Sequence, residues 1–126
     1  MSLKTIISQI HEIKAGSSVG YNKGFTAKAK TFIATLPIGH ADGIGRQYGN
    51  GKGKVLVRNK MAKIVGNVCM DMLMVDVTEL KCKEGDEVVF FDDNSYSAEE
   101  FSKNGNTISY ELISSISRRI KRVIIK

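Results

Sequence analysis

The sequence predicts a mainly β fold, a small barrel or sandwich with one or two short helices near the C-terminus. Short apolar and β-branched stretches recur along most of the chain, and turn residues separate them. The 126 residues include 12 glycines and one proline, and 42% are hydrophobic, which is enough to bury the core of one domain. We therefore expect a single domain over residues 1–126, with residues 1–3 set aside as a remnant of expression.

Turn residues divide the chain into short predicted strands. Apolar, β-branched runs cover residues 31–38 and 87–91, and such runs bounded by turn residues are typical of buried strands. Two runs that flank residues 59–60 predict a hairpin with a two-residue turn. In chain order we expect strands at residues 6–13, 31–38, 54–58, 61–65, 72–77, 87–91 and 122–125, and turns at 14–17, 49–53 and 84–86.

Two short helices are predicted between the last two strands. Ser97 and Glu100 have the spacing of a capping box, in which a hydroxyl and a carboxylate each satisfy a backbone N–H at the helix start. Asn104 and Gly105 form a typical C-terminal signal, so the first helix should end near them. The second helix is expected over residues 107–115, where apolar residues recur at helical spacing.

Charge and hydrophobicity argue against several classes of protein. The net charge is +6, and a basic cluster at residues 118–122 is a candidate nucleic-acid patch. Apolar residues interleave that cluster without an aromatic series, so we favour a solvated edge or a lining for an anionic substrate. No apolar run approaches the roughly 20 residues that cross a membrane, and the N-terminus lacks the pattern of a signal peptide.

Cys69 and Cys82, the two cysteines, do not make a disulfide framework. No paired cysteine or histidine spacing predicts zinc. Cys69 is better explained as a small buried apolar residue than as a reactive thiol. We expect a protein of the reducing cytoplasm with no metal site and with neither nucleic acid nor a membrane as a partner.

Without any relative in mind, few residues indicate catalysis. His40 and Asp42 are two positions apart, so on a strand they would share a face, which is a weak indication of acid–base chemistry. The chain has no nucleophile elbow and no phosphate-binding glycine loop with lysine. A β domain with a polar turn at residues 39–43 is then the better interpretation.

Short motifs in a fixed order indicate a family. The chain reads Val-Gly-Tyr at 19–21, Pro-Ile-Gly-His-Ala-Asp-Gly at 37–43 and Ile-Val-Gly-Asn-Val-Cys-Met-Asp at 64–71. Ile-Ser-Tyr-Glu at 108–111 and Ser-Arg-Arg at 117–119 follow. Together they resemble the C-terminal β domain of the alanine racemases, which use pyridoxal phosphate to make D-alanine for bacterial cell walls. The resemblance extends over nearly the whole chain.

The resemblance implies that Tyr21 is the catalytic residue. In the family the matching tyrosine reaches into the partner subunit's barrel and acts on one face of the substrate α-carbon, while the cofactor lysine acts on the other. Two groups are needed because racemisation removes a proton from one face and delivers one to the other. A phenol titrates near about 10, so a cation must lower its pKa; in the family an arginine–histidine network on the barrel does so. The alternative is that Tyr21 packs a turn.

Three residues are implied at the substrate. Met70 matches a residue whose backbone N–H binds the substrate carboxylate, with a side chain that mostly packs. Asp71 either orients that loop by hydrogen bonding or belongs to a plain turn. Tyr110 matches a tyrosine near the cofactor phosphate that limits pocket size, and the alternative is a core aromatic on a helix face.

Two residues are implied at the substrate access corridor. Arg46 matches a corridor arginine, and a surface charge is the alternative. His40 stands where most members have a corridor tyrosine, and histidine is smaller and changes charge near pH 6.5. Asn67 stands where many members have a corridor arginine. Asp42 is expected to hold its own tight turn as a structural residue.

The resemblance also implies a larger parent enzyme. That parent would interconvert L-alanine and D-alanine for peptidoglycan synthesis, and pyridoxal 5′-phosphate would be bound by a barrel domain that this chain does not include. Its partners would be that barrel and a second subunit in a head-to-tail homodimer. The chain alone should lack activity and expose an apolar surface. The departures from the family suggest a divergent branch, and some such branches fuse the racemase behind a cell-wall ligase domain.

Two other functions stay open. A related racemase for serine, lysine or another amino acid shares this layout, and the pocket volume around Tyr110 would distinguish it. A non-enzymatic basic β barrel that binds nucleic acid would instead show a salt-dependent oligonucleotide titration.

Overall fold

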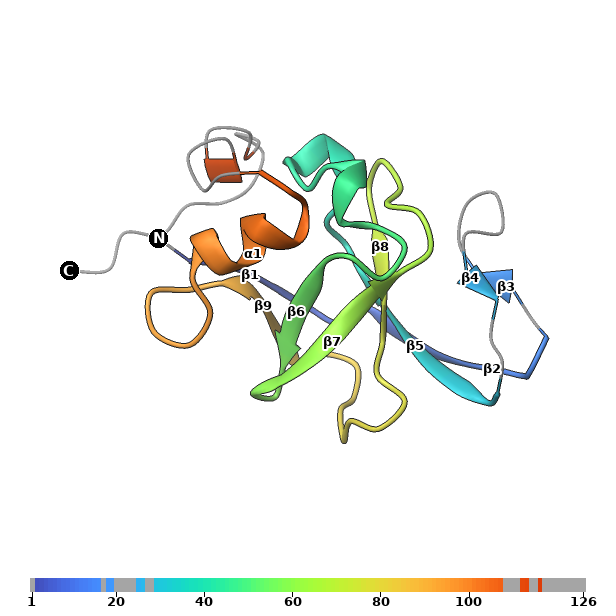
Figure 1. The fold of residues 1–126 in the computed structure, drawn as a ribbon. Helices are drawn as coiled ribbons and strands as arrows, with labels where there is room; N and C mark the ends of the chain where they lie inside the picture. The colour runs from blue at the N-terminus through green and yellow to red at the C-terminus, as the bar shows by residue number, and fades with distance from the viewer. Residues whose placement is uncertain are drawn as a thin grey trace.

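An antiparallel sheet dominates the computed structural model, which describes residues 2–16, 18–19, 25–26, 29–107, 112–113 and 116. The sheet has seven strands in the order β1-β9-β6-β7-β8-β5-β2, and it curls strongly (Figure 1). In chain order its strands are β1 (Leu3–Ile6), β2 (Gln9–Ile13), β5 (Thr31–Leu36), β6 (Lys54–Val57), β7 (Lys60–Val65), β8 (Leu73–Asp76) and β9 (Glu87–Phe91). A separate small sheet pairs β3 (Ser18–Val19) with β4 (Phe25–Thr26). The mainly β fold class predicted from the sequence is confirmed.

The two edge strands of the sheet, β1 and β2, are consecutive in the chain. At the joint between them, the Ile7 N–H donates to the Asp86 carbonyl and the Ser8 N–H donates to the Thr35 carbonyl, each at a distance of 3.0 Å. β1 pairs with β9, whereas β2 pairs with β5, so the chain changes partners here. The single strand predicted at residues 6–13 is therefore wrong. The sequence does not reveal the bend because Ile7, at the joint, is apolar and only 1% exposed, like a residue inside a strand.

The core fills the inside of the curled sheet. Buried and partly exposed residues alternate along β6 and β8, as expected for strands with one face on the core. Leu3, which the sequence argument set aside, is the first residue of β1 and is buried. The largest fully buried side chains are Tyr48, Phe90, Phe91, Phe101, Ile7, Ile33, Leu36, Ile44, Ile64, Leu73, Val55 and Val57.

Most strand limits lie within two residues of the prediction. β9 has the predicted bounds. β5 ends at Leu36 and not at residue 38, because Pro37 has no N–H to donate to a neighbouring strand. The turn between β6 and β7 is Arg58-Asn59, one residue earlier than predicted, and both residues have positive φ, 49° and 65°. Positive φ at both central residues is what a two-residue type I′ hairpin turn needs.

The helix α1 (Ala98–Asn104) begins as predicted. Ser97 Oγ accepts a hydrogen bond from the Glu100 N–H at 3.1 Å, and the Glu100 carboxylate accepts one from the Ser97 N–H at 3.3 Å. These two bonds form the capping box, so this prediction is confirmed. Of the second predicted helix, Leu112 and Ile113 are helical. The rest of that helix and the predicted strand at 122–125 fall on residues outside the described part of the chain.

Phe101 fastens α1 to the sheet through an aromatic cluster. Its ring stacks on Tyr48 with centroids 4.5 Å apart, and it meets Phe90 and Tyr96 edge-on at 5.9 Å and 6.2 Å. Such pairs are favourable beyond the apolar area that they bury. The cluster fixes Tyr48, and with it the 3₁₀ helix η3 (Arg46–Tyr48), against the barrel-like core.

Tyr96 should make the stability of the fold change with pH in the alkaline range. Burial raises its pKa to about 12, against the opposing effect of the hydrogen bond that Asn104 Nδ2 donates to its hydroxyl at 2.7 Å. The folded chain therefore holds this proton more tightly than the unfolded chain, whose phenol titrates near about 10. The stabilisation is complete below about pH 10 and is lost as pH rises to about 12. Urea unfolding of Tyr96→Phe should show a free energy of unfolding that falls less steeply than that of wild type between about pH 10 and pH 12. An unchanged slope would contradict the assignment of this pH dependence to Tyr96.

Candidate active site

Two turns meet where β5 ends and β8 begins. The 3₁₀ helix η2 (His40–Asp42) follows β5, and the loop of residues 66–72 leads into β8. The His40 N–H donates to the Cys69 carbonyl oxygen and the Ala41 N–H donates to the Met70 carbonyl oxygen, each at a distance of 2.9 Å. Two of the motifs found in the sequence are thus bound to each other through their backbones.

Gly39 makes the contact between these turns close. A Cβ atom at this position would clash with the Cys69 carbonyl oxygen and would lie 2.6 Å from the Met72 backbone nitrogen. The Gly39 N–H donates to Oδ2 of Asp42 at a distance of 3.1 Å, and Asp42 is only 2% exposed. The Asp42 carboxylate therefore closes the η2 turn from inside.

His40 and Asp42 do not share a face. They begin and end a 3₁₀ helix and not a strand, and His40 is exposed while Asp42 is buried. The acid–base pairing suggested by their spacing is therefore wrong. The reason is local: Pro37 ends β5, and Gly43, with φ of 105°, closes a tight turn behind Asp42.

Met70 is exposed at the surface of the loop. It is 57% exposed, and Met72 nearby is 42% exposed. Its carbonyl oxygen is occupied by the Ala41 N–H. Among the described residues, none accepts a hydrogen bond from the Met70 N–H. A backbone donor in a loop that is anchored by its carbonyls can receive an external anion such as a carboxylate.

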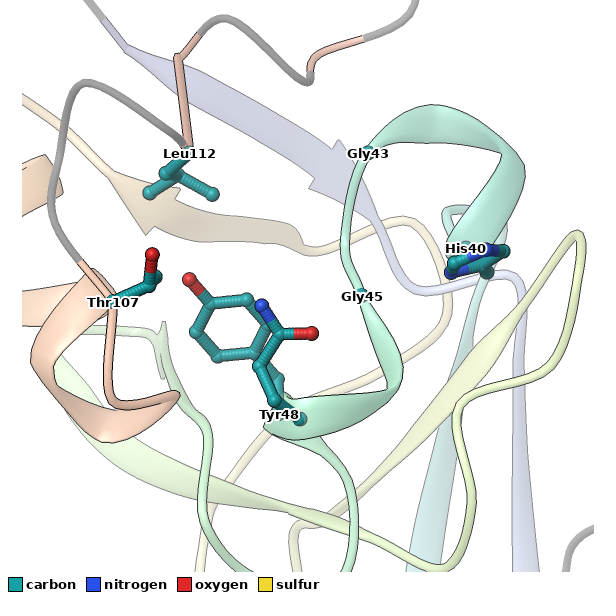
Figure 2. A pocket seen from close by; sticks show the side chains of 7 residues that line it. His40, Gly43, Gly45, Tyr48, Thr107 and Leu112 are labelled. Carbon is teal, nitrogen blue, oxygen red and sulfur yellow. The ribbon is translucent and has the colours of Figure 1, made fainter.

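A pocket of about 290 Å³ opens beside η2 and η3. Figure 2 shows Thr107 and Leu112, which come from the segment after α1, facing the Tyr48 ring, while His40 lies on the far side of the pocket. The lining residues are His40, Gly43, Gly45, Gln47, Tyr48, Thr107 and Leu112. Gln47, Tyr48 and Thr107 were not predicted as site residues, because no local pattern in the sequence shows that these distant segments meet.

The remaining predicted site residues are only partly placed. Tyr21 and Tyr110 fall outside the described residues; β3 ends two positions before Tyr21, and Thr107 and Leu112 bracket Tyr110. Arg46 is exposed at the start of η3, and Asp71 is exposed in the loop beside Met70. The roles given to these residues therefore stay predictions.

Cys69 and Cys82 are both free and half-buried. Burial, followed by the negative charge of Asp86, raises the pKa of the Cys82 thiol, which disfavours the reactive thiolate. Within the described ranges, no three His, Cys, Asp or Glu side chains gather as metal ligands. No helix of the described part has the length and apolar character to span a membrane.

Comparison with known proteins identifies the family. The family model described as "Alanine racemase, C-terminal domain" matches residues 1–124. The alanine racemase of Helicobacter acinonychis is 42% identical over 99% of this chain and 34% of its own length. The Bartonella henselae alanine racemase, solved with covalently bound pyridoxal phosphate, superposes with a TM-score of 0.91 at 34% identity over 98% of this chain and 34% of its own. The Clostridium difficile 630 alanine racemase in complex with cycloserine superposes with a TM-score of 0.85 at 38% identity, over 94% of this chain and 32% of its own.

The relatives are isomerases, and the β domain that they share with this chain makes up about a third of their length. The chain belongs to the alanine racemase C-terminal domain family. The resemblance drawn from the motifs is thereby confirmed. The chain spans about a third of the length of the racemases that it matches, so the activity of the whole enzyme is a proposal for this chain.

The described residues do not fit pyridoxal phosphate on their own. Enzymes of this kind hold the cofactor through a lysine Schiff base. Within the part of the chain that the structure describes, no lysine lines the pocket beside η2, nor the hollow around Phe32 and Thr78, nor the one around Arg58 and Glu87. The cofactor seen in the Bartonella relative therefore has no binding site among these residues.

Proposed function

We propose that this chain is the C-terminal domain of an alanine racemase that interconverts L-alanine and D-alanine in the cytoplasm for peptidoglycan synthesis. In this proposal the barrel domain would hold pyridoxal phosphate, which would supply an electron sink for the reaction. The β domain supplies Tyr21 to the barrel of the partner subunit in a homodimer. Fusion of the parent to a cell-wall ligase stays an expectation from the family resemblance.

One observation carries the proposal most directly. The η2 turn and the loop of residues 66–72 are bound through the His40 and Ala41 amides, which occupy the carbonyls of Cys69 and Met70. The Met70 N–H meets no acceptor among the described residues. This is the arrangement expected of a backbone donor kept for the carboxylate of an amino-acid substrate.

The exposed methionines support a docking role for the same end of the domain. Met70 and Met72 are both more than 40% exposed, although large apolar side chains are usually buried. Both belong to the loop of residues 66–72, which is hydrogen-bonded to η2. We propose that the partner's barrel covers them, so that the β domain completes a pocket it cannot form alone.

Tyr21 has a defined task in this arrangement. Its phenol removes or delivers a proton on one face of the substrate α-carbon, and the barrel lysine serves the other face. Each group then moves one proton, which a single fixed base on one face cannot do for both enantiomers. Tyr110 would bound the pocket, and Arg46 and His40 would line the access corridor.

Subunit complementation tests whether Tyr21 acts in trans. Two variants of the full-length racemase, one with Tyr21→Phe and one lacking the barrel's cofactor lysine, should each be inactive. When they are mixed and allowed to exchange subunits, half of the dimers contain one intact site. Racemisation should return to about a quarter of the wild-type rate, because the enzyme is a symmetric dimer.

The controls for this experiment are internal. Each variant mixed with itself should stay inactive, and wild-type racemase should convert L-alanine. If the mixture stays inactive although mass spectrometry shows mixed dimers, Tyr21 serves its own subunit. If Tyr21→Phe mixed with itself keeps wild-type activity, Tyr21 has no catalytic role. If wild-type racemase converts serine or lysine faster than alanine, the related-racemase alternative replaces the alanine assignment.

A further inference from the structure

We infer that Asn50 is a positioning residue, which holds the loop of residues 66–72 so that the Met70 N–H stays where a substrate carboxylate can bind. This inference rests on the role proposed above for the Met70 amide. Asn50 lies in the turn between η3 and β6. Nothing in its sequence neighbourhood marks it as part of the site.

Asn50 bonds the loop with both backbone and side chain. Its N–H donates to the Gly66 carbonyl oxygen at 2.8 Å. Its side-chain Nδ2 donates to Oδ1 of Asn67 at 3.0 Å. The next residue, Gly51, donates its N–H to the Ile64 carbonyl at 2.7 Å. The turn is therefore fastened to the end of β7 and to the first two residues of the loop.

The turn also packs directly against the loop. A Cβ atom at Gly49 would lie 2.9 Å from the Gly66 carbonyl oxygen and 3.3 Å from the Val68 nitrogen. The two backbones therefore approach each other closely enough that even a Cβ atom would not fit between them, which leaves little room for the loop to shift. The first half of the loop is thus fixed by the Asn50 turn.

The second half of the loop is fixed by η2. There the Cys69 and Met70 carbonyls accept from the His40 and Ala41 amides. Met70 lies next to this second anchor, and the Asn50 turn supplies the first. Weakening of the first anchor lets the loop shift about the second, which moves the Met70 N–H relative to a bound carboxylate without unfolding the sheet.

The conformation of Asn50 allows a clean deletion of its side chain. Asn50 has φ of 56°, in the left-handed region that glycine adopts without strain. Asn50→Gly therefore keeps the turn and the backbone bond to Gly66 and removes only the bond to Asn67. Asn59→Gly is the matched control, because Asn59 also has positive φ, 65°, but lies in the β6–β7 hairpin turn.

In the full-length racemase, Asn50→Gly should raise KM for alanine about three- to tenfold, the range expected for one hydrogen bond. The kcat should change less than about twofold, because a carboxylate contact is made equally in the ground and transition states. Asn59→Gly should match wild type in both constants. A change confined to thermal stability would mean that Asn50 is only structural.

Asparagine-to-aspartate variants test the bond itself. Asn50→Asp leaves a donor in the pair, because the Asn67 amide can turn its NH₂ group toward the new carboxylate. Asn67→Asp keeps the original Asn50 donor. The double variant places two acceptors opposite each other with no donor. We expect Asn50→Asp to restore most of what Asn50→Gly loses, and the double variant to raise KM beyond the combined effects of the single variants. Additive effects would overturn the inference.

Amide hydrogen exchange separates this inference from the proposed function. By mass spectrometry, peptides covering residues 66–72 should exchange faster in Asn50→Gly than in wild type, and no faster in Asn59→Gly. If wild-type racemase does not turn over alanine, the proposed function fails, and exchange alone decides whether Asn50 holds the loop. If exchange in the loop is unchanged by Asn50→Gly, the inference is overturned whatever the activity.

Discussion

Replacing Tyr21 with phenylalanine in the full-length racemase should lower kcat for alanine racemisation about 100- to 10,000-fold, the contribution of a positioned acid–base group. Phenylalanine keeps the ring and removes only the hydroxyl that carries the proton. Because the rest of the site is unchanged, KM should move far less than kcat. The loss should be similar for L- and D-alanine, since every racemisation event needs both faces.

Tyr96→Phe is the matched control for this prediction. Tyr96 packs in the aromatic cluster beneath α1, and its hydroxyl bonds Asn104. Loss of that hydroxyl removes a hydrogen bond in the core but no group of the proposed site, so kcat should stay near wild type. If Tyr21→Phe also retained wild-type kcat, Tyr21 would be a packing residue, and the family assignment would stand without its catalytic tyrosine.

Replacing Gly39 with alanine should disrupt the site through a purely steric effect. The new Cβ would clash with the Cys69 carbonyl oxygen and would lie 2.6 Å and 2.8 Å from the Met72 nitrogen and the Met70 carbonyl oxygen. All three atoms belong to backbone, so no flexible side chain can move aside. We expect a destabilisation of about 1–3 kcal/mol, typical of overpacking, and a large rise in KM for alanine as the Met70 loop is displaced.

Gly85→Ala controls for the general effect of removing a glycine. Gly85 has φ of 91° and open space where a Cβ would lie, so the methyl group is strained by its backbone angle alone, at about 1–2 kcal/mol. Thermal unfolding should show a loss for both variants, whereas only Gly39→Ala should change KM. Wild-type KM in Gly39→Ala would mean that the η2 turn does not position the Met70 loop.

Local chemistry explains what the sequence predicted well. The preference of Asn and Gly for positive φ acts within a single turn, and Asn50, Gly51 and Gly85 adopt it in the turns predicted at 49–53 and 84–86. The capping box of Ser97 and Glu100 spans only four residues, so the start of α1 also appears as predicted. The motifs at 37–43 and 64–71 indicated the family, which the comparisons confirm. Their direct backbone contact could not be read from spacing, because it depends on the pairing of β5 with β8.

Long-range pairing explains what the sequence missed. The bend at Ile7 arises because β1 and β2 find different partners, and the local sequence of residues 6–13 does not show which strands these are. The pocket residues Gln47 and Thr107 meet only after α1 packs on the sheet. The Asn50–Asn67 bond likewise joins a turn to a loop across the β6–β7 hairpin.

The most direct test of the central claim is α-proton exchange with solvent in the full-length racemase carrying Tyr21→Phe. L-alanine and D-alanine would be incubated separately in D₂O, and deuterium at the α-carbon would be followed by NMR. We predict that exchange is lost mainly for one enantiomer and persists for the other, because the barrel lysine still serves its own face. Exchange of both enantiomers at the wild-type rate would contradict it, and Tyr21 would then have no part in moving the proton.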